Sequence, residues 1–165
     1  MVVYSFHIFD RHAECIYSKR WHQAPGFSSM KSDRPRSGEI LAANGDAPAN
    51  KTLSREDDAK LIFGVVFSLR NMASRLGGDD NSFLCYRTKE YKLHYYETLT
   101  RMKFVMITDT KTNNLQLILH QIWATLYVEY VVKNPLSPAE HAGGVGVANE
   151  LFESALERFV TTMLV

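Results

Sequence analysis

The sequence predicts an α+β fold in which one antiparallel sheet carries helices on its faces. An apolar helix pattern at 54–76 is followed, almost without connecting sequence, by three strand patterns at 81–88, 90–98 and 101–109. Two more strand patterns precede the helix and two helix patterns follow the last strand. The resulting order is β-β-α-β-β-β-α-α. Because 165 residues amount to about one domain, we expect a single domain spanning 1–165.

The composition is ordinary for a globular domain and excludes two classes of partner. Hydrophobic residues make up 45% and charged residues 22% of the chain. The net charge of +1 argues against a nucleic-acid binder, which needs an excess of Lys and Arg. The apolar start lacks a basic segment, and no apolar run reaches the ~20 residues that span a bilayer. We therefore expect no nucleic-acid partner and no direct membrane insertion.

The first two strands read as a hairpin followed by an insertion. Residues 2–9 and 13–21 are rich in β-branched and aromatic side chains, and a short polar turn, Asp10 to His12, separates them. Residues from about 22 to 53 then carry Pro, Gly, Ser and Asn without periodicity. This stretch predicts a flexible, low-complexity loop.

The helix at 54–76 is apolar on more than one side. Ser54 and Asp57 resemble a capping box, and Gly77-Gly78 indicates the end. Helical spacing predicts a sheet-facing stripe, and three further apolar residues lie off it. A helix with this property is expected to be covered by its own sheet and by something else. The stripe comprises Ile62, Val65, Val66, Leu69, Met72, Ala73 and Leu76, and the residues off it are Leu61, Phe63 and Phe67.

The later strands and helices have distinct patterns. In 90–98, Leu93 and Tyr95 alternate with more polar neighbours, which predicts a half-buried strand. In 101–109 both parities are largely apolar, which predicts a central strand covered on both faces. The next helix is expected from Asn113-Asn114 to Val132, with an inward stripe of Leu115, Ile118, Leu119, Ile122, Leu126 and Tyr130. The last helix is expected to open at Asn149.

No residue pattern indicates an active site, a cofactor site or a metal site. Gly143, Gly144 and Gly146 precede a helix but lack the remaining residues of a phosphate-binding loop. The six histidines form no ligand grouping, and no nucleophile motif occurs. Cys15 and Cys85 lie in strand patterns, where a free cysteine usually behaves as a small buried hydrophobe. Two such cysteines fit a reducing, cytosolic compartment. The sequence therefore predicts no enzyme, no cofactor and no metal.

Several segments together resemble a known family. They are YSFHIFDRHAECIYSKRWH, EDDAKLIFGVVFSLRNMASRL, YRTKEYKLHYYET, KFVMITD and LYVEYVVKNPLSP. In this order and spacing they resemble the subunit 1 family of the TRAPP (transport protein particle) tethering complex, its small longin-like or SNARE-like core subunit. The resemblance covers nearly everything except 22–53 and 139–148.

The resemblance implies a longin-like fold: a five-stranded antiparallel sheet with one helix on one face and two on the other. It implies a non-catalytic subunit that pairs with a sister longin subunit and is flanked by subunits of the complex's other small fold. The assembled hetero-oligomer would bind a Rab-family GTPase and promote its nucleotide exchange in ER-to-Golgi transport. The implied location is cytoplasmic, peripheral at cis-Golgi and endoplasmic reticulum membranes.

The predicted partner-facing patch consists of Phe63, Phe67 and Asn71 on the first helix with Phe83 and Cys85 on the next strand. Exposed apolar patches mark interaction sites, and an uncovered strand edge invites pairing. The competing interpretation is that the two helix phenylalanines complete the protein's own core.

Two other functions compete with this one. A small coat-adaptor chain, or another longin-type trafficking subunit, shares the fold but not the motifs. A vesicle SNARE would be expected to continue into a heptad segment and a membrane anchor after the last helix. A stand-alone enzyme has no supporting residue constellation.

Overall fold

A computed structural model describes residues 2–22, 55–77, 82–138, 140–141 and 146–164. It confirms the α+β class and the order of elements. Five strands form one antiparallel sheet in the spatial order β2-β1-β5-β4-β3. Their bounds are β1 Val3–Phe9, β2 Cys15–Arg20, β3 Cys85–Arg87, β4 Lys92–Glu97 and β5 Lys103–Thr108.

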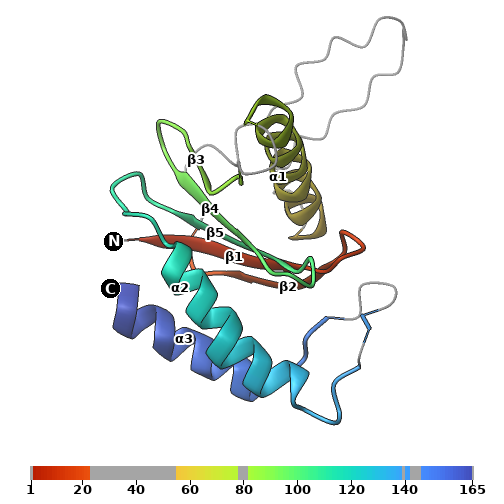
Figure 1. Cartoon of the computed structure of the whole chain (residues 1–165). Helices are drawn as coiled ribbons and strands as arrows, with labels where there is room; N and C mark the ends of the chain where they lie inside the picture. Colours follow the sequence, from red (N-terminus) through yellow and green to blue (C-terminus); the bar gives the residue numbers. More distant parts are fainter. Residues whose placement is uncertain (1, 23–54, 78–81, 139, 142–145, 165) are drawn as a thin grey trace, which may run out of the picture.

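Helices cover both faces of the sheet, as predicted (Figure 1). Helix α1, Arg55–Gly77, lies on one face, and α2, Gln116–Gln121, lies on the other. Helix α2 continues directly into the π-helix η2, Ile122–Val132. Helix α3, Glu150–Leu164, packs beside them. The predicted capping residue Ser54, residues 23–53 of the insertion and most of the glycines before α3 lie outside the described residues.

The polar turn of the first hairpin is built around one carboxylate. Asp10 Oδ1 accepts hydrogen bonds from the backbone N–H groups of His12 at 2.8 Å and Glu14 at 2.9 Å. Ala13 adopts φ 72°, in the left-handed region that non-glycine residues seldom enter. The aspartate therefore fixes a turn that has no glycine, which is why the sequence signal for this hairpin is modest.

Strand β5 is central and covered on both faces, as its sequence predicts. Phe104 and Met106 belong to the cluster beneath the η2 and α3 side, whereas Val105 and Ile107 belong to the cluster beneath α1. All four side chains are at most 1% exposed. Strand alternation thus assigns successive residues to two separate cores.

The half-buried alternation predicted for β4 is wrong at one position. His94 is 1% exposed, like its apolar neighbours. Its Nε2 pairs with Thr108 Oγ1 at 3.0 Å across the sheet, which satisfies one polar atom of the buried ring. A cross-strand partner of this kind leaves no trace in a hydropathy pattern.

The buried residues of η2 do not follow the 3.6-residue α-helical period on which the predicted inward stripe is based. They are Ile122, Tyr127 and Val131, whose spacings of five and four match the wider turn of a π-helix. Leu126 and Tyr130, which the 3.6-residue period assigned to the inner face, are only partly buried. Both still pack against the core cluster, as the predicted Ile118 does, but the predicted stripe omits the buried Tyr127 and Val131.

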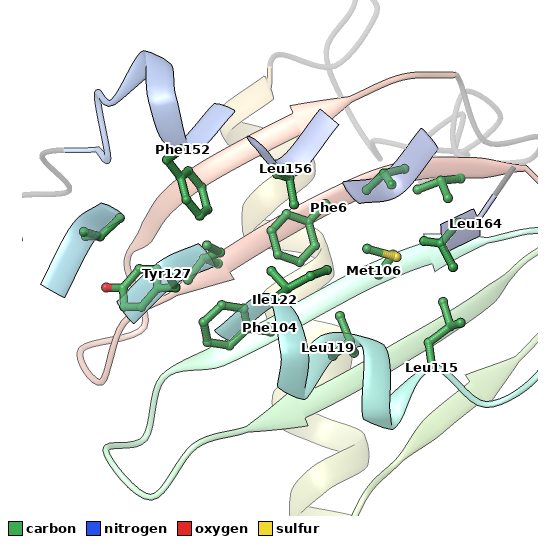
Figure 2. Packing of buried hydrophobic residues seen from close by; sticks show 14 of the residues in the cluster. Phe6, Phe104, Met106, Leu115, Leu119, Ile122, Tyr127, Phe152, Leu156 and Leu164 are labelled. Atoms are coloured by element: carbon green, nitrogen blue, oxygen red, sulfur yellow. The ribbon is translucent and has the colours of Figure 1, made fainter. Parts of the chain in front are cut away.

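The larger core fills the space between the sheet and the layer of η2 and α3 (Figure 2). Phe104 lies at its centre, with ring centroids 5.6 Å from Tyr127 in an edge-on contact and 6.3 Å from Phe6. Tyr127 in turn meets Phe152 of α3 at 6.4 Å. Aromatic contacts of this geometry add to the burial of apolar area.

Asn149 caps α3 and ties it to η2. Its Oδ1 accepts the N–H groups of Leu151 and Phe152 at 2.9 and 3.3 Å, and its Nδ2 donates to the carbonyl of Tyr130 at 2.7 Å. We expect Asn149→Ala to lower the free energy of unfolding by about 1–2 kcal/mol, since it removes a cap and an interhelical bond. Urea unfolding measures this. An Asn149→Asp variant, which keeps the capping oxygen, should lose less, and equal losses would contradict the capping role.

Candidate functional site

The inner face of α1 anchors the helix on the sheet. Ala59, Ile62 and Val66 are at most 4% exposed and belong to one core cluster with residues of three strands. Phe63 and Phe83 pack against the same cluster from its margin. The strand residues are Phe9, Leu93, Tyr95, Val105 and Ile107.

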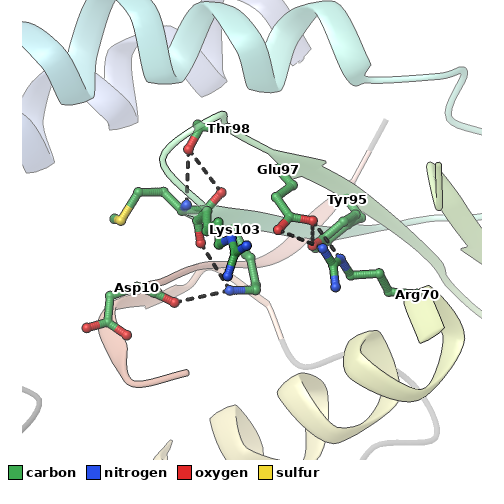
Figure 3. Close-up of polar contacts among 8 residues, drawn as sticks. Asp10, Arg70, Tyr95, Glu97, Thr98 and Lys103 are labelled. Carbon is green, nitrogen blue, oxygen red and sulfur yellow. Dashed lines mark hydrogen bonds and ion pairs between the residues drawn. The ribbon is translucent and has the colours of Figure 1, made fainter. Parts of the chain in front are cut away.

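Two ion pairs fix the angle at which α1 crosses the sheet. Near its start, Asp58 pairs with Arg20 of β2. Further along, Arg70 donates from Nε and Nη2 to the carboxylate of Glu97 at 2.7 and 3.2 Å (Figure 3). Tyr95 donates its hydroxyl to the same carboxylate at 2.9 Å. The helix is therefore tied to an edge strand on one side and to β4 on the other.

The polar network also shifts the pKa values of Arg70 and Tyr95. The hydrogen bonds to Glu97 raise the pKa of Arg70 above its usual value. Burial, followed by the charge of Glu97, raises the pKa of the Tyr95 hydroxyl. Both groups therefore stay protonated at neutral pH.

The predicted sheet-facing stripe of α1 is wrong for three of its residues. Val65 is 40%, Met72 53% and Leu76 82% exposed, and Leu61 on the same side is 41% exposed. The contact with the flat sheet buries only a narrow stripe, so residues flanking it remain in solvent. The prediction that α1 is apolar on more than one side is confirmed, and most of the surplus faces outward.

The structure separates the two phenylalanines of the predicted patch. Phe63 is partly buried, and its ring lies 5.4 Å from that of Phe9. Phe67 is 51% exposed and stacks on Phe63 at 6.0 Å. Phe63 thus contributes to the core, and Phe67 extends that core outward as an exposed ring. Asn71, one turn further along, is partly exposed.

The two strand residues of the predicted patch lie on different faces of the sheet. Phe83 packs on Tyr95 with ring centroids 5.4 Å apart, on the α1 side. Cys85 pairs with His94 and is exposed, so the expectation of a buried cysteine is wrong. Because facing residues of paired strands point to the same side, Cys85 shares the face of His94 and not that of α1.

Two exposed apolar residues that the predicted patch lacks lie at β3: Tyr86 within the strand and Leu84 directly before it. Strand β3 is an edge strand of three residues, and all three are exposed. Tyr86 pairs with Leu93, a residue of the α1 core, so Tyr86 lies on the α1 side, whereas Leu84 precedes the strand. They are 37% and 44% exposed. The predicted strand at 81–88 was too long, and the alternation within it would have indicated these residues.

We call the exposed apolar residues on this side of the sheet the α1–β3 surface. It comprises Leu61, Val65, Met72 and Leu76 on one flank of the buried stripe of α1, Phe67 on the opposite flank, and Tyr86 on β3. Exposed apolar residues beside a strand edge that no described strand pairs with are typical of a protein-interaction site. A partner could add contacts with both the helix and the strand.

The described part of the chain offers little chemistry. It holds no group of three His, Cys, Asp or Glu residues that could bind a metal ion. Cys15, half-buried, has its thiol pKa raised to about 11 by burial. Two buried histidines, His7 and His94, each keep a ring Nδ1 without a hydrogen-bond partner within the residues described. Burial lowers the pKa of both to about 4, with lesser effects of Arg20 and Lys92 respectively.

The buried histidines predict a loss of stability in acid. The pKa of His7 is about 4 in the folded chain and 6.5 in the unfolded chain, so the unfolded chain binds the proton more readily between these values. The contribution of neutral His7 to the free energy of unfolding is therefore fully present above pH 6.5 and is lost as the pH drops towards 4. We expect His7 to account for about 2 kcal/mol of the loss between pH 7 and pH 5. Urea unfolding at both pH values should show a smaller loss for His7→Gln than for the wild type, and an unchanged loss would contradict this.

No helix in the described ranges is long and apolar enough to cross a membrane.

The comparisons with known proteins agree on one family. The model of the Sybindin-like family matches residues 3–163. The transport protein particle subunit bet5 of Schizosaccharomyces pombe is 41% identical over 167 residues, covering 99% of this chain and 98% of that protein.

Relatives in other organisms match over similar lengths. The human trafficking protein particle complex subunit 1 is 34% identical to this chain, and the alignment covers 99% of this chain and 94% of the human protein. The subunit BET5 of Saccharomyces cerevisiae is 32% identical and covers 99% of both chains. Among solved structures, gliding protein MglB of Thermus thermophilus aligns with a TM-score of 0.38 at 16% sequence identity. The alignment covers 72% of this chain and 69% of MglB. This TM-score is too low to support a functional inference. Because the family model and these relatives span almost the whole chain, the protein belongs to the Sybindin-like family.

Proposed function

We propose that this chain is a non-catalytic core subunit of a TRAPP-type tethering complex. The relatives are named as subunits 1 and Bet5 of that complex, and they match this chain from end to end. The α1–β3 surface is the observation that carries the proposal, since it is an apolar face that the described chain does not cover.

In this proposal the chain supplies binding area and no reacting group. The assembled complex, with a sister longin subunit and subunits of the other small fold, binds a Rab-family GTPase. It accelerates nucleotide release by binding the nucleotide-free GTPase more tightly than the loaded form. The place of action is the cytoplasmic side of cis-Golgi and endoplasmic reticulum membranes, in ER-to-Golgi transport.

A nucleotide-release assay tests the proposal. The complex of the same organism is assembled with and without this chain, and release of fluorescent GDP from the Rab GTPase is followed over time. We expect release to be at least about tenfold faster with the complete complex, which corresponds to about 1.4 kcal/mol of barrier. A chain that stays monomeric when co-expressed with the other subunits, and leaves the release rate unchanged, would overturn the proposal.

A further inference from the structure

The turn between β4 and β5 presents an exposed leucine on a firmly held backbone. Leu99 is fully exposed, at 105% of the reference area. Beside it, the Thr98 hydroxyl accepts the Met102 N–H at 3.0 Å (Figure 3). The same hydroxyl pairs with the Thr100 hydroxyl at 2.8 Å. The Thr98 N–H donates to the Met102 carbonyl at 2.9 Å. The turn is therefore closed by its own side chains.

A lysine ties this turn to the neighbouring hairpin. Lys103 Nζ donates to the carbonyl of Arg101 at 3.0 Å and to that of Asp10 at 3.2 Å. Arg101 itself has φ 61° and an exposed side chain. An ordered turn loses little conformational entropy when a partner binds, so its exposed groups are well suited to specific docking.

An aromatic group lies close to this turn, where β4 meets α2 and η2. Tyr96 pairs its hydroxyl with Nδ1 of His120 at 2.8 Å, and the two rings meet edge-on at 5.5 Å. Trp123 lies 5.4 Å from His120 and 6.4 Å from Tyr96. Tyr96 and Trp123 are partly exposed, and His120 is exposed. These side chains hold one another in place.

The turn and the aromatic group pack against the same core cluster. Met102, Tyr96 and Trp123 all pack at the margin of the core cluster beneath η2 and α3. We call Tyr96, Leu99, Met102, His120 and Trp123 the hairpin surface. Tyr96 is separated from the α1–β3 surface by the sheet, because it alternates with Tyr95 of the α1 core. Tyr and Trp are the residue types enriched where protein partners bind most strongly.

The charges at the turn that carries Leu99 are the cations Arg101 and Lys103 and the anions Glu97 and Asp10, which both act on Lys103. No Asp or Glu occurs between Asp109 and Glu129, the segment that includes α2 and the start of η2. The nearby Glu97 is engaged by Arg70 and Tyr95 on the α1 side. Arg101 is thus the exposed charged side chain next to Leu99, and it complements a carboxylate on the partner.

We propose that the hairpin surface docks a protein subunit that offers an apolar pocket for Leu99 and a carboxylate for Arg101. The ordered turn and the aromatic group favour a protein over a membrane. Anionic membranes bind clusters of several exposed Lys and Arg residues, whereas this turn carries Arg101 and a Lys103 whose ammonium group is held by the carbonyls of Arg101 and Asp10. The identity of the partner as a subunit of the same complex rests on the proposed function.

The test uses the full-length tagged chain co-expressed with the other TRAPP subunits of the same organism. Leu99→Asp is compared with the wild type and with the matched control Leu151→Asp, whose leucine is 67% exposed on α3. We expect Leu99→Asp to weaken retention of one subunit at least about tenfold, as for a central interface residue, and Leu151→Asp to retain it. A photo-crosslinking amino acid at position 99 should label that subunit.

Each other outcome counts against the inference. Full retention of every subunit by Leu99→Asp would overturn it and leave the proposed function intact. If the wild type retains no subunit, the proposed function fails and this inference fails with it. If Leu99→Asp lowers the melting temperature, the crosslink at position 99 decides, and its absence overturns the inference. Flotation of the wild type, but not of Leu99→Asp, with phosphatidylserine vesicles would assign the surface to a membrane instead.

Discussion

Truncating Phe104 to alanine is expected to lower the free energy of unfolding by about 4 kcal/mol. The side chain is fully buried on the central strand, and it contacts rings of β1, β4 and η2. The change removes apolar area and leaves a cavity that four elements would have to close. Urea unfolding followed by circular dichroism measures the loss.

A milder change at the same position serves as the control. Phe104→Leu keeps much of the volume and should cost less than half as much as Phe104→Ala. Comparable losses for the two variants would contradict the description of Phe104 as the centre of the larger core.

Replacing Arg20 with methionine is expected to cost about 3 kcal/mol. The change keeps apolar volume but leaves the Asp58 carboxylate, 7% exposed, without its ion-pair partner. We take the lower end of the range for buried pairs because the Arg20 side chain is 36% exposed and water screens it in part. Because Asp58 lies in the first turns of α1, the loss should appear first as fraying of this helix.

A double-mutant cycle distinguishes the ion pair from packing. Arg20→Met combined with Asp58→Asn removes the unpaired charge, so the double variant should be more stable than Arg20→Met alone. Hydrogen exchange should show reduced protection at the start of α1 in Arg20→Met only. Additive losses would mean that the two residues do not act as a pair.

Much of the fold could be predicted because its signals are local. The apolar runs of β1 and β5, the turn at Asp10 and the helix pattern of α3 are each specified by residues adjacent in sequence. His94 and η2 could not be predicted in the same way. The environment of His94 depends on Thr108, fourteen positions away. The π-helical turn changes which residues face inward without changing the composition.

The candidate site could be predicted from the sequence less completely than the fold. The sequence indicates that α1 has too many apolar residues for one buried face, but it does not fix the rotation of the helix on the sheet. The structure does so through Ala59, Ile62 and Val66, which leaves Val65 and Met72 outside. It likewise shows that Cys85 faces away from α1, because its pairing with His94 is a tertiary property.

We propose that the α1–β3 surface binds another subunit and that Phe67 belongs to the contact. Phe67→Glu places a charge on the outer side of α1, where the ring is 51% exposed, so the isolated chain should keep its melting temperature within a few degrees. Leu151→Glu on α3, an exposed apolar residue of the other helical layer, is the matched control.

The direct measurement is size-exclusion chromatography with quantitative mass spectrometry of complexes purified through the tagged chain. We predict that Phe67→Glu loses at least one partner subunit and that Leu151→Glu retains all of them. A Phe67→Glu chain that folds and still assembles to the wild-type stoichiometry, with unchanged GDP release from the Rab GTPase, would contradict the account.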